Sequence, residues 1–321
     1  MSIVETVYKA SPTQRRSRSI SMSRLSADLA LLFAAFVWGV AFLFQKSAMA
    51  EIGPLTFVAA RCTVATLVLL PFALAETKRV ASPVPAGLWR IGSLAGAAFF
   101  TAAWLQQGGI ITATVTNTGF LTALYVVITP FIAWVIDGKI PNAVVWPAVA
   151  LSAVGTWLLG GGSLSHFSHG DMLVAISALF WAAHVVIVGR AAEHARPILF
   201  TTVQFAIVAV LAMAGAAMLE TPSAPALMAA INSILYVGVL SSALTFTLLT
   251  IALQYTPPLE AAVIVSLETL FAAFSAYLVL GERLPPIAWI GAAMIMSGTL
   301  VIQLGAHKRK PAMVPEREPA P

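Results

Sequence analysis

Residues 137–141 read Asp-Gly-Lys-Ile-Pro, and residues 281–285 read Gly-Glu-Arg-Leu-Pro, so a short charged segment that ends in proline occurs twice, 144 positions apart. Around this segment the chain matches itself at a shift of 143, which pairs Trp38 with Trp181, Pro54 with Pro197, Trp146 with Trp289 and Gly155 with Gly298. An internal repeat of this length indicates two related halves, and in transporters such halves enclose the binding site between them.

The composition is that of a protein dissolved in lipid. Of the 321 residues, 59% are hydrophobic and only 10% are charged, with a mean hydropathy of +0.90. A typical soluble domain carries roughly 25% charged residues. So much apolar surface cannot be hidden inside a soluble protein of this size, and we therefore predict an integral membrane protein in contact with the lipid bilayer.

Ten apolar windows are long enough to cross a hydrocarbon core of about 30 Å. They cover residues 28–48, 54–75, 89–107, 113–136, 143–160, 171–189, 198–219, 229–253, 258–280 and 286–305. They lack the alternation of barrel strands, and a bilayer admits only helices or closed barrels. The sequence therefore predicts an all-α protein with ten transmembrane helices.

Basic residues are concentrated on one side of these windows. Fifteen of the 18 Lys and Arg residues flank that side, Lys46 and Arg283 lie on the other, and Arg61 falls inside the second window. By the positive-inside rule both termini are cytoplasmic, with basic tails at 1–27 and 307–321. This placement, in spite of a pI of 9.6, excludes nucleic acid as the partner.

Each half contains five windows, an odd number, so the second half starts on the opposite side of the membrane from the first. We predict two inverted five-helix repeats, at 28–161 and 170–306. Such repeats place a binding site near the membrane midplane and open it alternately to either side.

Short segments in both halves resemble a known family. Phe36-Val37-Trp38-Gly39, Ala59-Ala60-Arg61 and the run 119–125 are similar to the first EamA repeat of the drug/metabolite transporter superfamily, and Ser266-Leu267-Glu268-Thr269 with Gly281-Glu282-Arg283-Leu284 to the second. The resemblance covers about residues 30–305. It implies a ten-helix bundle that moves small metabolites across the bacterial inner membrane, often outward. It departs at Thr269, where many relatives have proline.

Two charged residues fall at membrane depth, where a charge is costly and usually functional. Glu268 lies ten residues past Pro258, or ~15 Å into the bilayer. Burial disfavours the charged form of a carboxyl, which suits reversible protonation; the alternative is a carboxyl held by a neighbouring donor. Arg61 lies seven residues past Pro54, or ~10 Å deep. It would bind a substrate carboxylate, pair with Glu268, or extend to the headgroups.

The remaining candidates for a substrate cavity are polar or aromatic residues on shared helix faces. Trp38 and Gln45 are seven apart, and His184 follows Trp181 by three, which places each pair on one face. Gln204 is the repeat counterpart of Arg61. A polar stripe at helical spacing and a smaller serine and threonine cluster complete the set: Asn117, Thr118, Thr122, Tyr125 and Thr129, then Ser241, Ser242 and Thr245. Helix packing is the alternative role for each of these.

Features of enzymes and metal sites are missing from the sequence. It contains no HExxH, P-loop or GxSxG motif, which argues against catalysis and ATP-driven transport. His166, His169 and Asp171 form a weak metal pattern that we interpret as a solvated loop, and Cys62 is a lone cysteine inside a span. We therefore expect no metal and no cofactor.

The sequence favours a secondary transporter, a proton-coupled exporter of a small amino-acid-like or amine-like metabolite, acting as a monomer or a homodimer. A lipid-linked substrate flippase or a passive exchanger is the alternative within transport. A membrane enzyme or a regulatory subunit is the alternative outside it.

Overall fold

The computed structural model describes residues 22–80, 82–138, 143, 145–159, 161–162, 168–191 and 196–307. Most of both predicted tails (1–21 and 308–321), Lys139 and His166 lie outside these residues. Every regular element described is helical: α1 Arg24–Ala48, α2 Pro54–Arg79, α3 Ala86–Gly109, α4 Val115–Thr122, α5 Tyr125–Asp137, α6 Val145–Leu159, α7 His169–Ala191, α8 Pro197–Leu219, α9 Ala224–Ala229, α10 Ile231–Leu235, the π-helix η2 Tyr236–Leu244, α11 Thr245–Ala252, α12 Pro258–Val265, α13 Glu268–Leu280 and α14 Pro286–His307.

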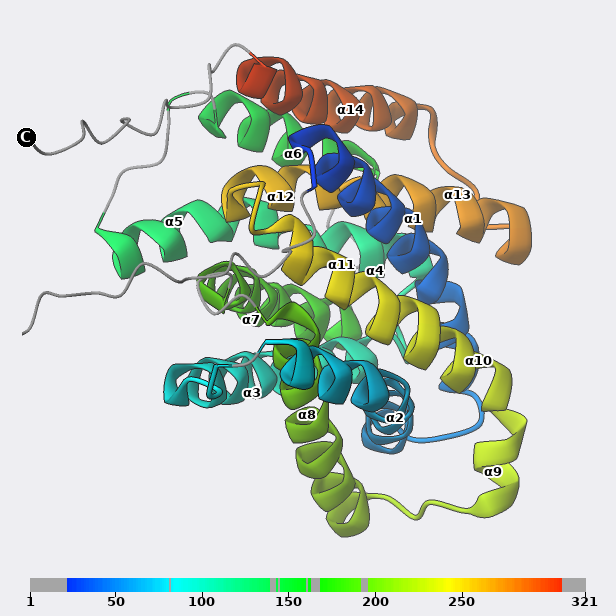
Figure 1. The fold of residues 1–321 in the computed structure, drawn as a ribbon. Coiled ribbons are helices and arrows are strands. Elements are labelled where there is room, and N and C mark those ends of the chain that lie inside the picture. The colour runs from blue at the N-terminus through cyan, green and yellow to red at the C-terminus, as the bar shows by residue number, and fades with distance from the viewer. Residues whose placement is uncertain are drawn as a thin grey trace, which may run out of the picture.

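The helices form one bundle (Figure 1), and many large apolar side chains are exposed on its outside. Eight helical stretches in the described residues are long and apolar enough to cross a membrane, and each coincides with one predicted window. The two other windows, 143–160 and 286–305, contain shorter apolar helices, Val145–Leu159 and Pro286–Val301. Large side chains such as Leu67, Val135 and Leu278 are more than 60% exposed. The chain is a multi-pass membrane protein, whose exposed apolar surface faces lipid.

The repeat-equivalent helices α2 and α8 run antiparallel, and each caps the other. The Glu220 carboxylate, just after α8, accepts hydrogen bonds from Leu55 N and Thr56 N at 2.8 Å at the start of α2. Glu76, near the end of α2, accepts one from Leu199 N at 2.8 Å at the start of α8. A carboxylate at a helix N-terminus satisfies free N–H groups and complements the helix dipole.

The second pair of equivalent helices, α6 and α14, makes a close glycine contact. A Cβ at Gly155 would lie 2.6 Å from Gly291 O, and a Cβ at Gly291 would lie 2.3 Å from Gly155 O. Gly298 approaches Ala148 O in the same way, so these helices are also antiparallel. The glycine spacing in the sequence therefore marks a helix-packing face.

Among the other helices, the first helix of each half packs against helices of the opposite half. Helix α1 packs on α12 and α13 of the second half, and its equivalent α7 packs on α4 and α5 of the first. Helix α3 contacts α7 and α8, while η2 contacts α1 and α2. In Figure 1, α6 and α14 lie at one edge of the bundle and α2 and α8 toward the other, so α1 and α7 run through its middle.

Two predicted spans are interrupted at equivalent positions. A turn at 123–124 separates α4 from α5, and a turn at 266–267 separates α12 from α13. The first residues after these turns, Tyr125 and Glu268, are repeat equivalents. The second turn is present although the residue after Glu268 is Thr269 and not proline. A third span, 229–253, contains the nine-residue π-helix η2, and such segments often occur at functional sites.

The α6–α14 contact generates a stability prediction with an internal control. Gly291→Ala places a methyl group against backbone atoms 2.3 and 2.5 Å away, and we expect it to destabilise the protein by about 1–3 kcal/mol. Gly108→Ala, whose Cβ would meet only Leu173 Cδ1 at 3.9 Å, is expected to be neutral or stabilising because alanine favours helix. Thermal unfolding of the two purified variants in detergent checks this. Equal melting temperatures would contradict the close contact.

Candidate functional site

A cavity of about 70 Å³ lies between the two halves, enough for several water molecules. Both halves supply its walls, which are formed by Trp38, Phe42, Gln45, Arg61, Gln106, Thr122, Tyr125, Trp181, His184, Val185, Ser241, Phe246, Leu249, Ala261, Ala262, Val265 and Glu268. Nine of the fifteen candidates named from the sequence are in this set: Trp38, Gln45, Arg61, Thr122, Tyr125, Trp181, His184, Ser241 and Glu268. The structure thus brings together residues from α1, α2, α4, α5, α7, η2 and α13.

The cavity approximately follows the internal repeat. Trp38 and Trp181 are equivalents, as are Tyr125 and Glu268, and all four line it. Gly39 allows α1 to approach α13, since a Cβ there would lie 2.6 Å from the Glu268 carbonyl oxygen. The charges do not follow the repeat. Glu268 is a carboxylic acid where its equivalent Tyr125 is a phenol, and Arg61 is a cation where its equivalent Gln204 is a neutral amide.

Arg61 is a buried cation whose charge is not compensated. The side chain is 4% exposed, and its guanidinium lies 5.8 Å from the Phe57 ring centre and 5.7 Å from that of Phe99. Its Nε and Nη2 have no hydrogen-bond partner in the described part of the chain. The hypothesised pair with Glu268 is not formed, since no ion pair among the described residues joins them. Buried charges without partners are costly and call for a functional explanation.

Aromatic rings form the apolar wall. The Phe246 ring lies 4.7 Å from that of Trp38 and 6.2 Å from that of Trp181. The Trp38 indole donates to Ser241 O in η2 at 2.8 Å. The equivalent Trp181 Nε1 finds no acceptor among the described residues. Of the two equivalent tryptophans, Trp38 has a hydrogen-bonded indole N–H, and the indole N–H of Trp181 has no acceptor among the described residues.

Two further polar contacts fix side chains of the wall. His184 Nε2 lies 2.9 Å from Gln204 Oε1, so Gln204 supports a lining residue without lining the cavity itself. The Gln106 amide donates to Thr122 Oγ1 at 2.8 Å. Gln45 Oε1, by contrast, has no partner in the residues described. The Tyr125 hydroxyl faces the carboxyl of its repeat equivalent, Glu268.

Most of the remaining predicted residues lie outside the wall. Thr118 and Thr245 donate to carbonyls one helical turn back, at 2.7 and 2.6 Å, as threonines in membrane helices commonly do. Thr129 does the same. Ser241 lines the cavity, and Ser242 is buried beside it in the sequence. Asn117 lies near the start of α4 and reaches Asp171.

Sequence reasoning missed Phe42, Gln106 and Phe246 among the lining residues. Gln106 carried a usable signal, as a polar residue inside an apolar window. Phe42 carried a weaker one, because it lies four residues after Trp38 on the same helix face. Phe246 carried none that separates it from the lipid-facing phenylalanines.

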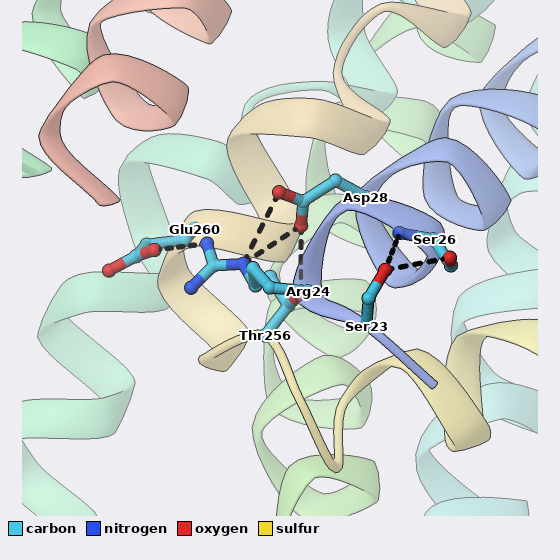
Figure 2. Close-up of polar contacts among 6 residues, drawn as sticks. All are labelled: Ser23, Arg24, Ser26, Asp28, Thr256 and Glu260. Atoms are coloured by element: carbon cyan, nitrogen blue, oxygen red, sulfur yellow. Dashed lines mark hydrogen bonds and ion pairs between the residues drawn. The ribbon is translucent and has the colours of Figure 1, made fainter. Parts of the chain in front are cut away.

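An ion-pair cluster joins the start of α1 to the start of α12 (Figure 2). Arg24 in the first turn of α1 lies between Asp28, at 3.1 Å, and Glu260 of α12, at 2.5 Å. Thr256 Oγ1 donates to the same Asp28 carboxylate at 2.8 Å. Arg24, assigned from the sequence to a basic tail, is instead part of helix α1. Because the charges of Arg24 and Glu260 come from different halves, the cluster joins α1 to α12.

Asp171, the repeat equivalent of Asp28, makes the corresponding link from α7. Its carboxylate accepts from Asn117 Nδ2 at 3.3 Å and from Ser168 N at 2.8 Å. Asn117 is in turn equivalent to Glu260. The interpretation as a solvated loop is wrong for Asp171, which is 2% exposed and lies in the first turn of α7. His169 begins the same helix and is exposed, and His166 lies outside the described residues. No group of metal-binding side chains occurs among the described residues.

Comparison with known proteins decides the family. The model of the EamA-like transporter family matches residues 25–161 and again residues 168–304. The chain belongs to the EamA-like transporter family. The resemblance seen in the sequence is thereby confirmed, and the family is one of transporters and not of enzymes.

Relatives of this EamA-like protein extend over nearly the whole chain. It is 29% identical to an uncharacterized transporter of Archaeoglobus fulgidus over 301 residues, which is 92% of each chain. It is 27% identical to the uncharacterized transporter YwfM of Bacillus subtilis, covering 89% of this chain and 96% of that one. A solved crystal structure at 18% identity has the same fold, with a TM-score of 0.73 over 89% of this chain and 99% of the other.

The contrast between two arginines of this transporter gives a stability prediction. Arg61→Met removes an uncompensated buried charge, so we expect unchanged or higher stability. Arg24→Met leaves Asp28 and Glu260 without their cation, and we expect a loss of roughly 1–3 kcal/mol, allowing for the partial exposure of Arg24. Thermal unfolding in detergent measures both. A clear destabilisation by Arg61→Met would show that Arg61 has a structural partner.

Proposed function

We propose that this protein is a secondary active transporter that moves a small amphipathic metabolite, amino-acid-like or amine-like, by alternating access. The observation that carries the proposal is the cavity between the two halves, which contains a buried acid and a buried base in a chain of a transporter family. We place the transporter in the bacterial inner membrane, with both termini in the cytoplasm, and the proposed direction of transport is export. One chain contains both repeats, so a monomer suffices as the transport unit.

The proposal takes the two repeats as inverted and α6 and α14 as the fifth and tenth membrane helices. Its support is the antiparallel course of two pairs of equivalent helices, α2 with α8 and α6 with α14. The contacts at the helix ends agree with it. Glu220 caps α2, and Lys46 Nζ donates to Ile110 O at 2.8 Å; both contacts join ends that the charge pattern places outside.

Alternating access requires closures at both ends that open in turn. The Arg24–Glu260 contact and the Asn117–Asp171 contact are equivalent under the repeat and lie at opposite ends of the proposed topology. The first is an ion pair at 2.5 Å and the second an amide–carboxylate hydrogen bond at 3.3 Å. Because charge-assisted pairs are the stronger, we propose that the end with Asn117 and Asp171, the outer one, opens more readily.

Glu268 is the proposed coupling group. Among the described residues it is the only acid in the cavity wall, it is 4% exposed, and it begins a half-helix at the interruption between α12 and α13. In the proposed antiport, its carboxyl takes a proton from outside and gives it up to the cytoplasm as solute moves the other way. The other titratable residues of the wall are Arg61, Tyr125 and His184.

Comparison of metabolites in the medium tests this function. Cells expressing the wild type, Glu268→Gln or the exposed-site control Glu51→Gln, at matched membrane levels, are compared with an empty control. We expect one solute enriched outside with the wild type and the Glu51 variant and not with Glu268→Gln, because the amide cannot carry a proton. Equal enrichment with Glu268→Gln would remove the coupling role and favour a passive exchanger. No enrichment over the empty control would contradict export.

A further inference from the structure

We infer that the solute is a zwitterion, an α-amino acid with an apolar side chain, whose carboxylate binds Arg61 and whose ammonium group binds Glu268. The inference rests on the proposed transport function and chooses between the amino-acid-like and amine-like classes. It starts from the polar groups of the cavity wall that lack partners.

The unpartnered donors suit a carboxylate. Arg61 offers Nε and Nη2, and Trp181 offers its indole N–H, with no acceptor for any of them in the part of the chain that the structure describes. The fold does not require such a vacancy at this position, because the equivalent Trp38 N–H is satisfied by Ser241 O. Guanidinium groups bind carboxylates through two parallel hydrogen bonds, and the indole would add a third.

The unpartnered acceptors suit an ammonium group. Gln45 Oε1 has no donor among the described residues. His184 Nε2 faces Gln204 Oε1, which can only accept, so Nε2 carries the proton and the neutral ring presents Nδ1 as a free acceptor. Glu268 adds the single carboxyl of the wall. Three acceptors match the three N–H groups of an ammonium ion.

Charge balance favours the zwitterion over a simple amine and over a simple carboxylate. Arg61 and Glu268 both line this cavity of about 70 Å³, so a small solute that fills it would meet both. A simple amine would leave the guanidinium uncompensated, and a simple carboxylate would leave Glu268 without a cation. An uncompensated charge at this depth is costly. The rings of Trp38, Trp181 and Phe246 then provide the apolar surface for the side chain.

The same arrangement explains how solute and proton would be exchanged. The ammonium group requires the Glu268 carboxylate, so its arrival releases the proton that the carboxyl carried, and its departure allows a proton to return. Proton and solute therefore occupy Glu268 in alternation, as antiport requires. Arg61 keeps its charge throughout.

Binding to the purified full-length protein tests the inference with matched sets of probes. The sets are alanine, ethylamine and propionate; leucine, 3-methylbutylamine and 4-methylpentanoate; and phenylalanine, 2-phenylethylamine and 3-phenylpropionate. Affinity is measured by thermal stabilisation in detergent. We expect at least one amino acid to bind roughly tenfold more tightly than both analogues of its set, as expected for loss of one charged contact.

Variants make the test specific to the two contacts. Arg61→Gln should reduce the affinity for the amino acid to that for its amine and leave the amine unaffected. Glu268→Gln should reduce the affinity for the amino acid to the affinity for its carboxylate analogue. Arg90→Gln and Glu51→Gln, both at exposed positions, should change neither. A general loss of packing would weaken all three probes together.

Three outcomes would overturn the inference. They are equal binding of an amine or a carboxylate analogue, variants that weaken all probes alike, and a panel in which no amino acid binds. In each case export of another solute in the medium comparison would leave the proposed transport function intact. Failure of that comparison, together with amino-acid binding of the expected pattern, would instead retain the site and reject export.

Discussion

Helix ends inside a bilayer must find hydrogen-bond partners within the protein, because lipid offers none, and this constraint joins the two halves of the molecule. The carboxylate of Glu220 caps α2, that of Glu76 caps α8 and that of Glu282 caps α4, where it accepts from Val115 N at 3.1 Å. Each carboxylate comes from the half opposite to the helix that it caps. The caps therefore fix how the halves meet, and the cavity is the space that remains between them.

The polar groups of the cavity are exceptions to this rule. Elsewhere in the described chain, buried Arg196, 2% exposed, has backbone acceptors: its Nη2 donates to the carbonyl oxygens of Val80 and Ser82, although its Nη1 has no partner among the described residues. Arg61 is equally buried, and neither its Nε nor its Nη2 has an acceptor there. The backbone thus anchors Arg196 and does not anchor Arg61, which is why Arg61 is the arginine that we propose to bind a ligand. A protein that keeps such an unpaired group gives up stability for binding.

The repeat and the membrane spans could be predicted because they depend on composition and spacing alone. Trp38, Trp181 and Glu268 were predictable as cavity residues, since each is unusual at its depth in an apolar helix. The Arg24–Asp28–Glu260 cluster was not, because its members are separated by 236 residues and lie at helix ends where charges are ordinary. The packing of Phe246 between two tryptophans also depends on tertiary contacts, which no single helix reveals.

The most direct test of alternating access is the reactivity of a cysteine placed in the cavity. The native Cys62 is buried away from it, so Cys62→Ala with Thr122→Cys gives a single probe on the wall. A membrane-impermeant thiol reagent is applied to right-side-out and to inside-out vesicles. The account predicts labelling from both sides, because the two closures open in turn. Labelling from one side only would contradict it.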